Sequence, residues 1–123
     1  MTPSTTIEVL AGESIDVDCS CKDDAGAALD VSGANVIFEV VSVQPHTLAP
    51  TGTQLFQRRN AAAGGGATEV VQPIPTLGTE TFRVKVIPSN TTTRGRYRYR
   101  TRVEWPSASP PVARIWEGDF VIL

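Results

Sequence analysis

The chain has 123 residues, of which 41% are hydrophobic and 20% charged, and these values are typical of a folded globular domain. Its length allows one two-layer core but not two domains of ordinary size, so we expect a single domain over residues 1–123. No stretch approaches the roughly 18 consecutive apolar residues of a membrane span, and the N-terminus lacks the basic and apolar segments of a signal peptide.

Apolar and polar residues alternate with period two, which is the pattern of half-buried antiparallel strands. Turn residues separate the expected strands, which cover residues 5–10, 14–19, 34–43, 53–59, 68–72, 79–87, 95–105 and 112–123. The glycine-rich stretch at about 60–67 is predicted to be a flexible loop. Seven to eight strands at this spacing predict an all-β fold, an immunoglobulin-like antiparallel β-sandwich.

The two cysteines, Cys19 and Cys21, are one residue apart, so on a strand they point to the same face about 6 to 7 Å apart. That separation exceeds comfortable disulfide geometry. We expect two reduced thiols in the core or at its rim, with a redox or intermolecular role as the alternative. The lone histidine, His46, has no companion at metal-ligand spacing, so no metal or cofactor is expected.

The clearest pattern lies between Gly95 and Trp105, where aromatic and basic residues alternate. Tyr97, Tyr99, Val103 and Trp105 are predicted on one face of a strand, and Arg96, Arg98, Arg100 and Arg102 on the other. Single-stranded nucleic acid needs arginines and stacking aromatics on one surface. The alternation and the net charge of −2 therefore argue against a nucleic-acid partner.

Charge is unevenly distributed along the chain. Residues 1–40 hold eight acids and one lysine, a net charge of −7, whereas residues 81–123 hold eight arginines or lysines and three acids, a net charge of +5. One hypothesis is that Asp16, Asp18 and Glu39 pair with the arginines on neighbouring strands. The other is that the arginine face binds an acidic face of another subunit, with Asp16 and Asp18 among the residues involved.

Catalytic patterns are weak in this sequence, and we expect no enzyme activity and no small-molecule substrate. His46 lies between a proline and a threonine in a predicted surface loop, where any triad drawn around it would be arbitrary. Glu117 and Asp119 are predicted to point to solvent or to the arginines, on a strand with a bulge at Gly118. The acidic pairs Asp16/Asp18 and Asp23/Asp24 match no EF-hand spacing.

Four short segments, taken in order, resemble a known pattern. They are Glu8-Val9-Leu10-Ala11-Gly12-Glu13-Ser14, the stretch from Lys22-Asp23-Asp24-Ala25-Gly26 to Gly33-Ala34, Gly95-Arg96-Tyr97-Arg98-Tyr99, and Trp116-Glu117-Gly118-Asp119-Phe120-Val121-Ile122. The pattern is similar to that of small immunoglobulin-like domains of phage tail and baseplate proteins, including the N-terminal domain of the baseplate upper protein family. Two features depart from it: Val31-Ser32 in place of Leu-Thr, and the glycine-rich insertion at residues 60–66.

The resemblance implies a non-enzymatic bacteriophage virion protein, a tail, baseplate or fibre-attachment component, made in the bacterial host cytoplasm. Its partners would be other virion proteins, or further copies of itself in a homo-oligomer. Capsid decoration is the nearest alternative. A carbohydrate-binding or host-adhesion module is the second, in which Trp105 or Trp116 would stack on sugar rings.

Overall fold

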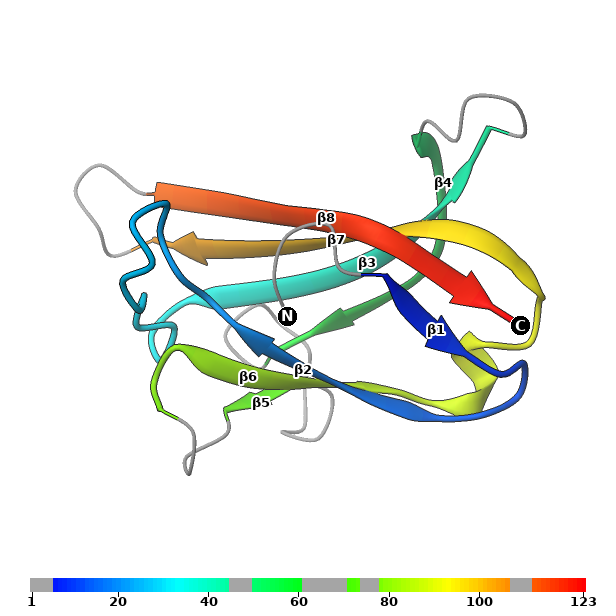
Figure 1. The fold of residues 1–123 in the computed structure, drawn as a ribbon, viewed down its shortest axis with the longest axis horizontal. Helices are drawn as coiled ribbons and strands as arrows, with labels where there is room; N and C mark the ends of the chain where they lie inside the picture. The colour runs from blue at the N-terminus through cyan, green and yellow to red at the C-terminus, as the bar shows by residue number, and fades with distance from the viewer. Residues whose placement is uncertain (1–5, 45–49, 61–70, 74–77, 107–111) are drawn as a thin grey trace.

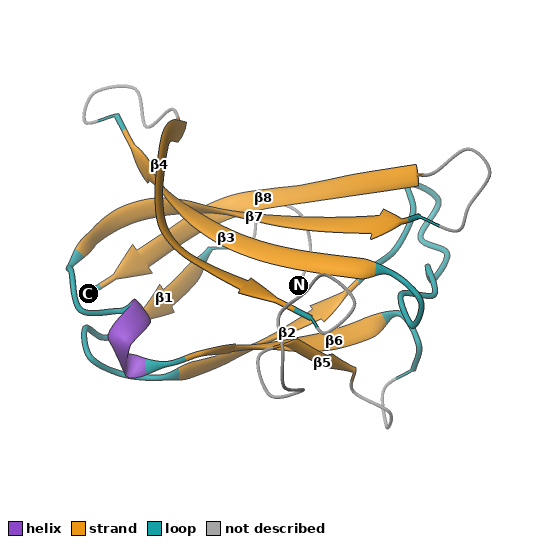
Figure 2. Ribbon diagram, turned by 180° about the vertical axis from the view of Figure 1, so that it is seen from behind, coloured by secondary structure: helices purple, strands orange, loops and turns teal. Residues whose placement is uncertain are grey.

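A computed structural model describes residues 6–44, 50–60, 71–73, 78–106 and 112–123 and shows two stacked β-sheets (Figure 1). The strands of the five-stranded sheet are, in spatial order, β1 (Ile7–Val9), β8 (Val112–Ile122), β7 (Gly95–Trp105), β3 (Asn35–Val43) and β4 (Pro50–Arg59). The three-stranded sheet consists of β2 (Ile15–Ser20), β6 (Thr81–Val86) and β5 (Val71–Pro73). A 3-10 turn at Pro88–Asn90 lies between β6 and β7 (Figure 2). The predicted all-β, immunoglobulin-like sandwich is confirmed.

One strand pair differs from the expected antiparallel arrangement. β1 runs parallel to β8, with Ile7 opposite Phe120 and Val9 opposite Ile122, whereas every other described pair of strands is antiparallel. The turn that follows β1 carries the chain across to β2 in the other sheet, so β1 and β2 form no hairpin. Hydrogen bonds from Leu123 N to Val9 O (2.8 Å) and from Ala11 N to Leu123 O (2.9 Å) hold the end of β1 to the end of β8.

The core is centred on four aromatic rings of the five-stranded sheet. Phe38 is fully buried and lies 5.7 Å from Tyr99, 6.4 Å from Phe120 and 6.3 Å from Phe56, measured between ring centroids. Valines of the three-stranded sheet, including Val84 at 0% exposure, belong to the same cluster. Aromatic pairs at such separations add stability beyond the burial of their area. The shared face predicted for Tyr97, Tyr99 and Val103 on β7 is therefore confirmed, and it lies in the core.

Tyr97 makes the contact known as a tyrosine corner in immunoglobulin-like domains. It lies near the start of β7, and its Oη donates a hydrogen bond to the carbonyl oxygen of Thr93, four residues upstream, at 2.9 Å. In antibody domains a core cysteine follows that tyrosine by two residues and is bonded to a cysteine on the second strand. Here that position holds Tyr99, so the aromatic cluster stands where a disulfide would lie.

Removing only the hydroxyl of that corner should have a modest effect. We expect Tyr97→Phe to lower the free energy of unfolding by about 0.5–1.5 kcal/mol, because one intramolecular hydrogen bond is lost while the ring stays packed. Urea denaturation followed by tryptophan fluorescence would measure the loss. An unchanged midpoint would show that the bond to Thr93 contributes nothing to stability.

Both cysteines are free and buried, as predicted. Cys19 projects into the core from β2, and Cys21 follows the same strand and is 2% exposed. Burial raises the pKa of the Cys19 thiol to about 12 and the pKa of the Cys21 thiol to about 11. Since the thiolate is the reactive form, both sulfurs should be inert in the folded protein near neutral pH.

Two further expectations concern the strands themselves. The bulge predicted at Gly118 is wrong, because β7 and β8 pair in continuous register and Gly118 lies directly opposite Tyr99. The register shifts occur between β3 and β4, around Val41. The predicted glycine-rich loop falls almost entirely on residues 61–70, which lie outside the described residues. Within the described ranges, no helix is long and apolar enough to cross a membrane.

Candidate functional site: a charged sheet face

The outer surface of the five-stranded sheet carries the predicted arginines, and the structure adds carboxylates between them. We call this surface the charged face; it consists of Glu39 on β3, Arg96, Arg98, Arg100, Arg102 and Glu104 on β7, and Glu117 and Asp119 on β8. β-strand geometry places all of these residues on the side opposite the buried aromatics. These residues are four cations and four anions, and Glu8 on β1 and Arg59 on β4 are further exposed charges of the same outer surface.

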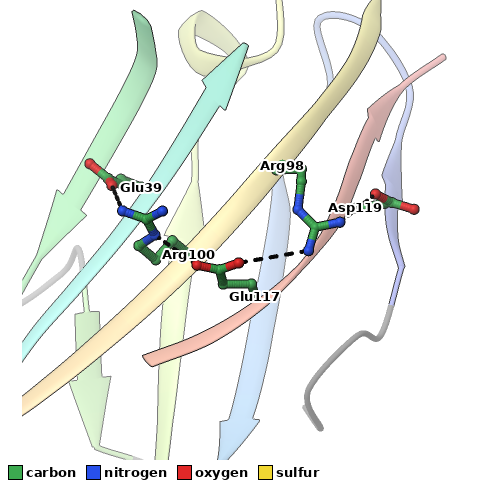
Figure 3. Close-up of polar contacts among 5 residues, drawn as sticks. All are labelled: Glu39, Arg98, Arg100, Glu117 and Asp119. Atoms are coloured by element: carbon green, nitrogen blue, oxygen red, sulfur yellow. Dashed lines mark hydrogen bonds and ion pairs between the residues drawn. The ribbon is translucent and has the colours of Figure 1, made fainter. Parts of the chain in front are cut away.

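The charges form a continuous chain of contacts across three strands (Figure 3). Arg100 lies between two carboxylates, 3.0 Å from Glu117 and 3.7 Å from Glu39. Arg98 contacts Asp119 at 3.4 Å and Glu117 at 3.8 Å. These contacts follow from the register, because Arg98 is directly opposite Asp119, and Arg100 is directly opposite both Glu117 and Glu39.

The two ends of the arginine row are also paired. Arg96 donates to Asp119 at 3.0 Å, and Arg102 donates to Glu104 of its own strand at 2.9 Å. The arginine side chains are 30–53% exposed, so each pair is screened by water and adds little to stability on its own. The hypothesis that the arginines pair with acids of neighbouring strands is confirmed for Glu39, and Glu117 and Asp119 point to the arginines as expected.

Asp16 and Asp18 are not neighbours of this arginine row, and their predicted pairing with it is wrong. Both lie on β2 of the other sheet, where Asp18 pairs with Arg83 of β6 at 2.7 Å. The hydrogen bond from Arg83 lowers the pKa of Asp18. The ionised Asp18–Arg83 pair therefore stabilises the fold above the pKa of an unfolded aspartate, at about 4. That stabilisation is lost as the pH falls through the lower pKa that Asp18 has in the folded chain.

A depression of about 230 Å³ opens on the same outer surface, next to the salt-bridge chain. It is lined by Ile37, Glu39, Gln57, Arg100, Arg102 and Ile115. Ile37 and Ile115 lie opposite Arg102 on either side, and Ile115 is 49% exposed. The outer surface is therefore charged along one half and partly apolar along the other.

The two tryptophans proposed for sugar stacking pack against the hydrophobic core as partly buried residues. The indole nitrogen of Trp105 donates a hydrogen bond to the carbonyl oxygen of Asp30 at 2.7 Å, which fastens the connection between β2 and β3 to the end of β7. Trp116 is opposite Thr101, a buried residue of β7. Both rings therefore have structural contacts in the sandwich.

Other candidate residues show no arrangement suited to a metal. Within the ranges that the structure describes, no group of three or more histidine, cysteine or acidic side chains could hold a metal ion. Asp23 accepts hydrogen bonds from the backbone nitrogens of Ala25 and Ala27, both at 2.9 Å, and so shapes its own turn. His46 lies outside the described residues.

Asp119 offers a direct test of the salt-bridge chain, because it contacts both Arg96 and Arg98. We expect Asp119→Asn to lower the free energy of unfolding by about 0.5–1 kcal/mol at low salt, and by less in 0.5 M NaCl, where screening is stronger. Urea denaturation at both salt concentrations would measure this. Asp24→Asn, in an exposed turn, is the control, and an equal loss in both variants would contradict the proposed coupling.

The sequence prediction omitted two parts of this site. The first is Glu104, which alternates in phase with the arginines of β7, so the strand pattern could have placed it on their face. Ile37 and Ile115 are far apart in the sequence and line the same depression only because β3 and β8 flank the same strand.

No protein-family model matches the chain, and no curated protein matches it.

Proposed function

We propose that this chain is a non-enzymatic structural protein of a bacteriophage particle, a tail, baseplate or fibre-attachment component that acts by protein–protein assembly. The observation that carries the proposal is the ordered set of four sequence segments that resemble phage tail and baseplate domains. In the fold they occupy β1 with its following turn, the connection from β2 to β3, the start of β7, and β8. Three of them therefore lie in or beside strands of the five-stranded sheet, and the fourth is the connection that links the two sheets.

The geometry supports assembly as the mode of action. The charged face is broad and solvent-exposed, and it includes Arg100, a residue type that is enriched in protein–protein interfaces. Its acids and bases alternate between neighbouring strands, which favours a partner with its own pattern of charge. Such a surface suits a joint between subunits in a particle.

Mass spectrometry of purified phage particles would test this proposal. A copy number between a handful and a few dozen per particle is expected for a tail or baseplate joint. Hundreds of copies would instead support capsid decoration. Absence of the chain from intact particles would overturn the assignment to the virion.

Carbohydrate binding is the alternative that Trp105 and Trp116 would serve. The packing of both rings against the core favours assembly over sugar stacking. Titration with a broad glycan panel would separate the two, because a sugar stacked on either indole changes its fluorescence. Unchanged emission across the panel would remove the support for a lectin.

A further inference from the structure

The charged face has a property that neither an arginine row nor an acidic patch would have: it is complementary to itself. Its cations lie along β7, and carboxylates lie on β8 and β3, one strand away on either side. Neighbouring strands are about 4.8 Å apart. When two copies of the face are laid against each other with an offset of one strand, the cations of one copy therefore lie opposite carboxylates of the other.

We propose that the charged face binds the charged face of a second copy of this chain, as a two-fold symmetric dimer. A two-fold axis that runs along the sheet between β7 and β8 places β7 of each copy over β8 of the other. Arg98 and Arg100 of one copy then lie opposite Asp119 and Glu117 of the second copy. Each arginine keeps its partner within the chain and gains a carboxylate across the interface.

The area of the overlap suits a weak, salt-sensitive dimer. In the proposed arrangement the 11 residues of β7 and of β8 lie over one another, and the three residues of β1 lie over part of β3. At about 3.3 Å per residue and 4.8 Å per strand, the two copies overlap over roughly 440 Å² each. Stable interfaces bury about 800 Å² on each partner, so this contact belongs to the class of weak complexes.

The composition of the face favours a second copy over other partners. A uniformly acidic partner would meet Glu39, Glu117 and Asp119 as well as the arginines, and like charges would oppose binding. Ile115 lies on the same surface and is 49% exposed, and in the proposed arrangement it lies over Arg102 of the second copy, whose aliphatic stem it can cover. The second copy thus offers carboxylates to the arginines and an arginine stem to Ile115.

Self-association is measured on the purified chain, so its failure is distinguishable from the failure of the phage assignment, which is tested on particles. We expect sedimentation equilibrium to show a dimer whose dissociation constant rises at least threefold between 0.05 and 0.5 M NaCl. Ile115→Lys should raise the dissociation constant at least tenfold, because the lysine adds a cation that has no carboxylate partner in the interface. Ile87→Lys is the matched control: Ile87 is 40% exposed and follows β6 of the other sheet, so its substitution should leave the dimer unchanged.

A charge inversion tests the arrangement itself. The inverted variant carries Glu39→Arg, Arg96→Glu, Arg98→Glu, Arg100→Glu, Glu117→Arg and Asp119→Arg, which reverses the sign of every residue in five of the observed ion pairs and keeps each pair within the chain. It should dimerise with itself, whereas mixed dimers with the wild-type chain should be depleted at least tenfold in native mass spectrometry. Mixed dimers in statistical proportion would overturn the proposed charge matching.

A monomeric wild-type chain at several hundred micromolar would overturn the dimer, as would an equal effect of Ile115→Lys and Ile87→Lys. Circular dichroism of each variant checks its fold. If the inverted variant does not fold, the comparison of the two lysine variants still decides the proposal.

Discussion

Phe38→Ala should lower the free energy of unfolding by about 3–5 kcal/mol, which is a large fraction of the stability of a small domain. Phe38 is fully buried on β3, an inner strand of the five-stranded sheet, and packs against three other aromatic rings, those of Phe56, Tyr99 and Phe120. Its removal leaves a cavity that the surrounding strands cannot close, because their hydrogen bonds fix their spacing. We therefore expect a lower urea midpoint for this variant.

Denaturation in urea, followed by circular dichroism, would measure this loss. Phe38→Leu should cost clearly less, since it keeps most of the apolar volume. Leu10→Ala is the surface control and should cost less than about 1 kcal/mol, because Leu10 is 60% exposed. A loss below about 1.5 kcal/mol for Phe38→Ala would show that the aromatic cluster is not the centre of the core.

Alkaline pH should destabilise the fold through its buried thiols and phenol. Burial raises the pKa of Cys19 from 9.0 to about 12, and that of Tyr99 from 10.0 to about 12, with a smaller contribution from the neighbouring Cys19. The unfolded chain therefore loses these protons at lower pH than the folded chain does. The stabilisation is complete below about pH 9 and is lost as the pH rises from 9 toward 12, by up to about 1.4 kcal/mol per pH unit for each group.

Urea midpoints at pH 7, 9, 10 and 11, measured with a reductant present, would reveal this slope. Cys19→Ala removes one of the titrating thiols, so its stability should be lower at neutral pH but should fall less steeply between pH 9 and 11. Thiol labelling at pH 8 provides an independent check, with labelling expected only after unfolding. Rapid labelling of the native protein would contradict the burial of Cys19 and Cys21.

The sequence was sufficient to predict the strands and the direction of their side chains. Along β7, arginine alternates with tyrosine, and a strand can satisfy both residue types only by facing the aromatics inward and the arginines to solvent. The close spacing of Cys19 and Cys21 likewise excluded a comfortable disulfide between them. These predictions needed only local geometry and the burial of apolar area.

The neighbours of each strand were decided by the tertiary structure alone. Alternation fixes which face a residue occupies but not which strand lies beside it, so the acidic first third of the chain seemed the natural partner of the arginines. The crossing from β1 to β2 instead places Asp16 and Asp18 on the other sheet, and β8 and β3 bring Glu117, Asp119 and Glu39 to β7. Sheet order depends on how the two layers close over the aromatic core, a non-local property that no short segment encodes.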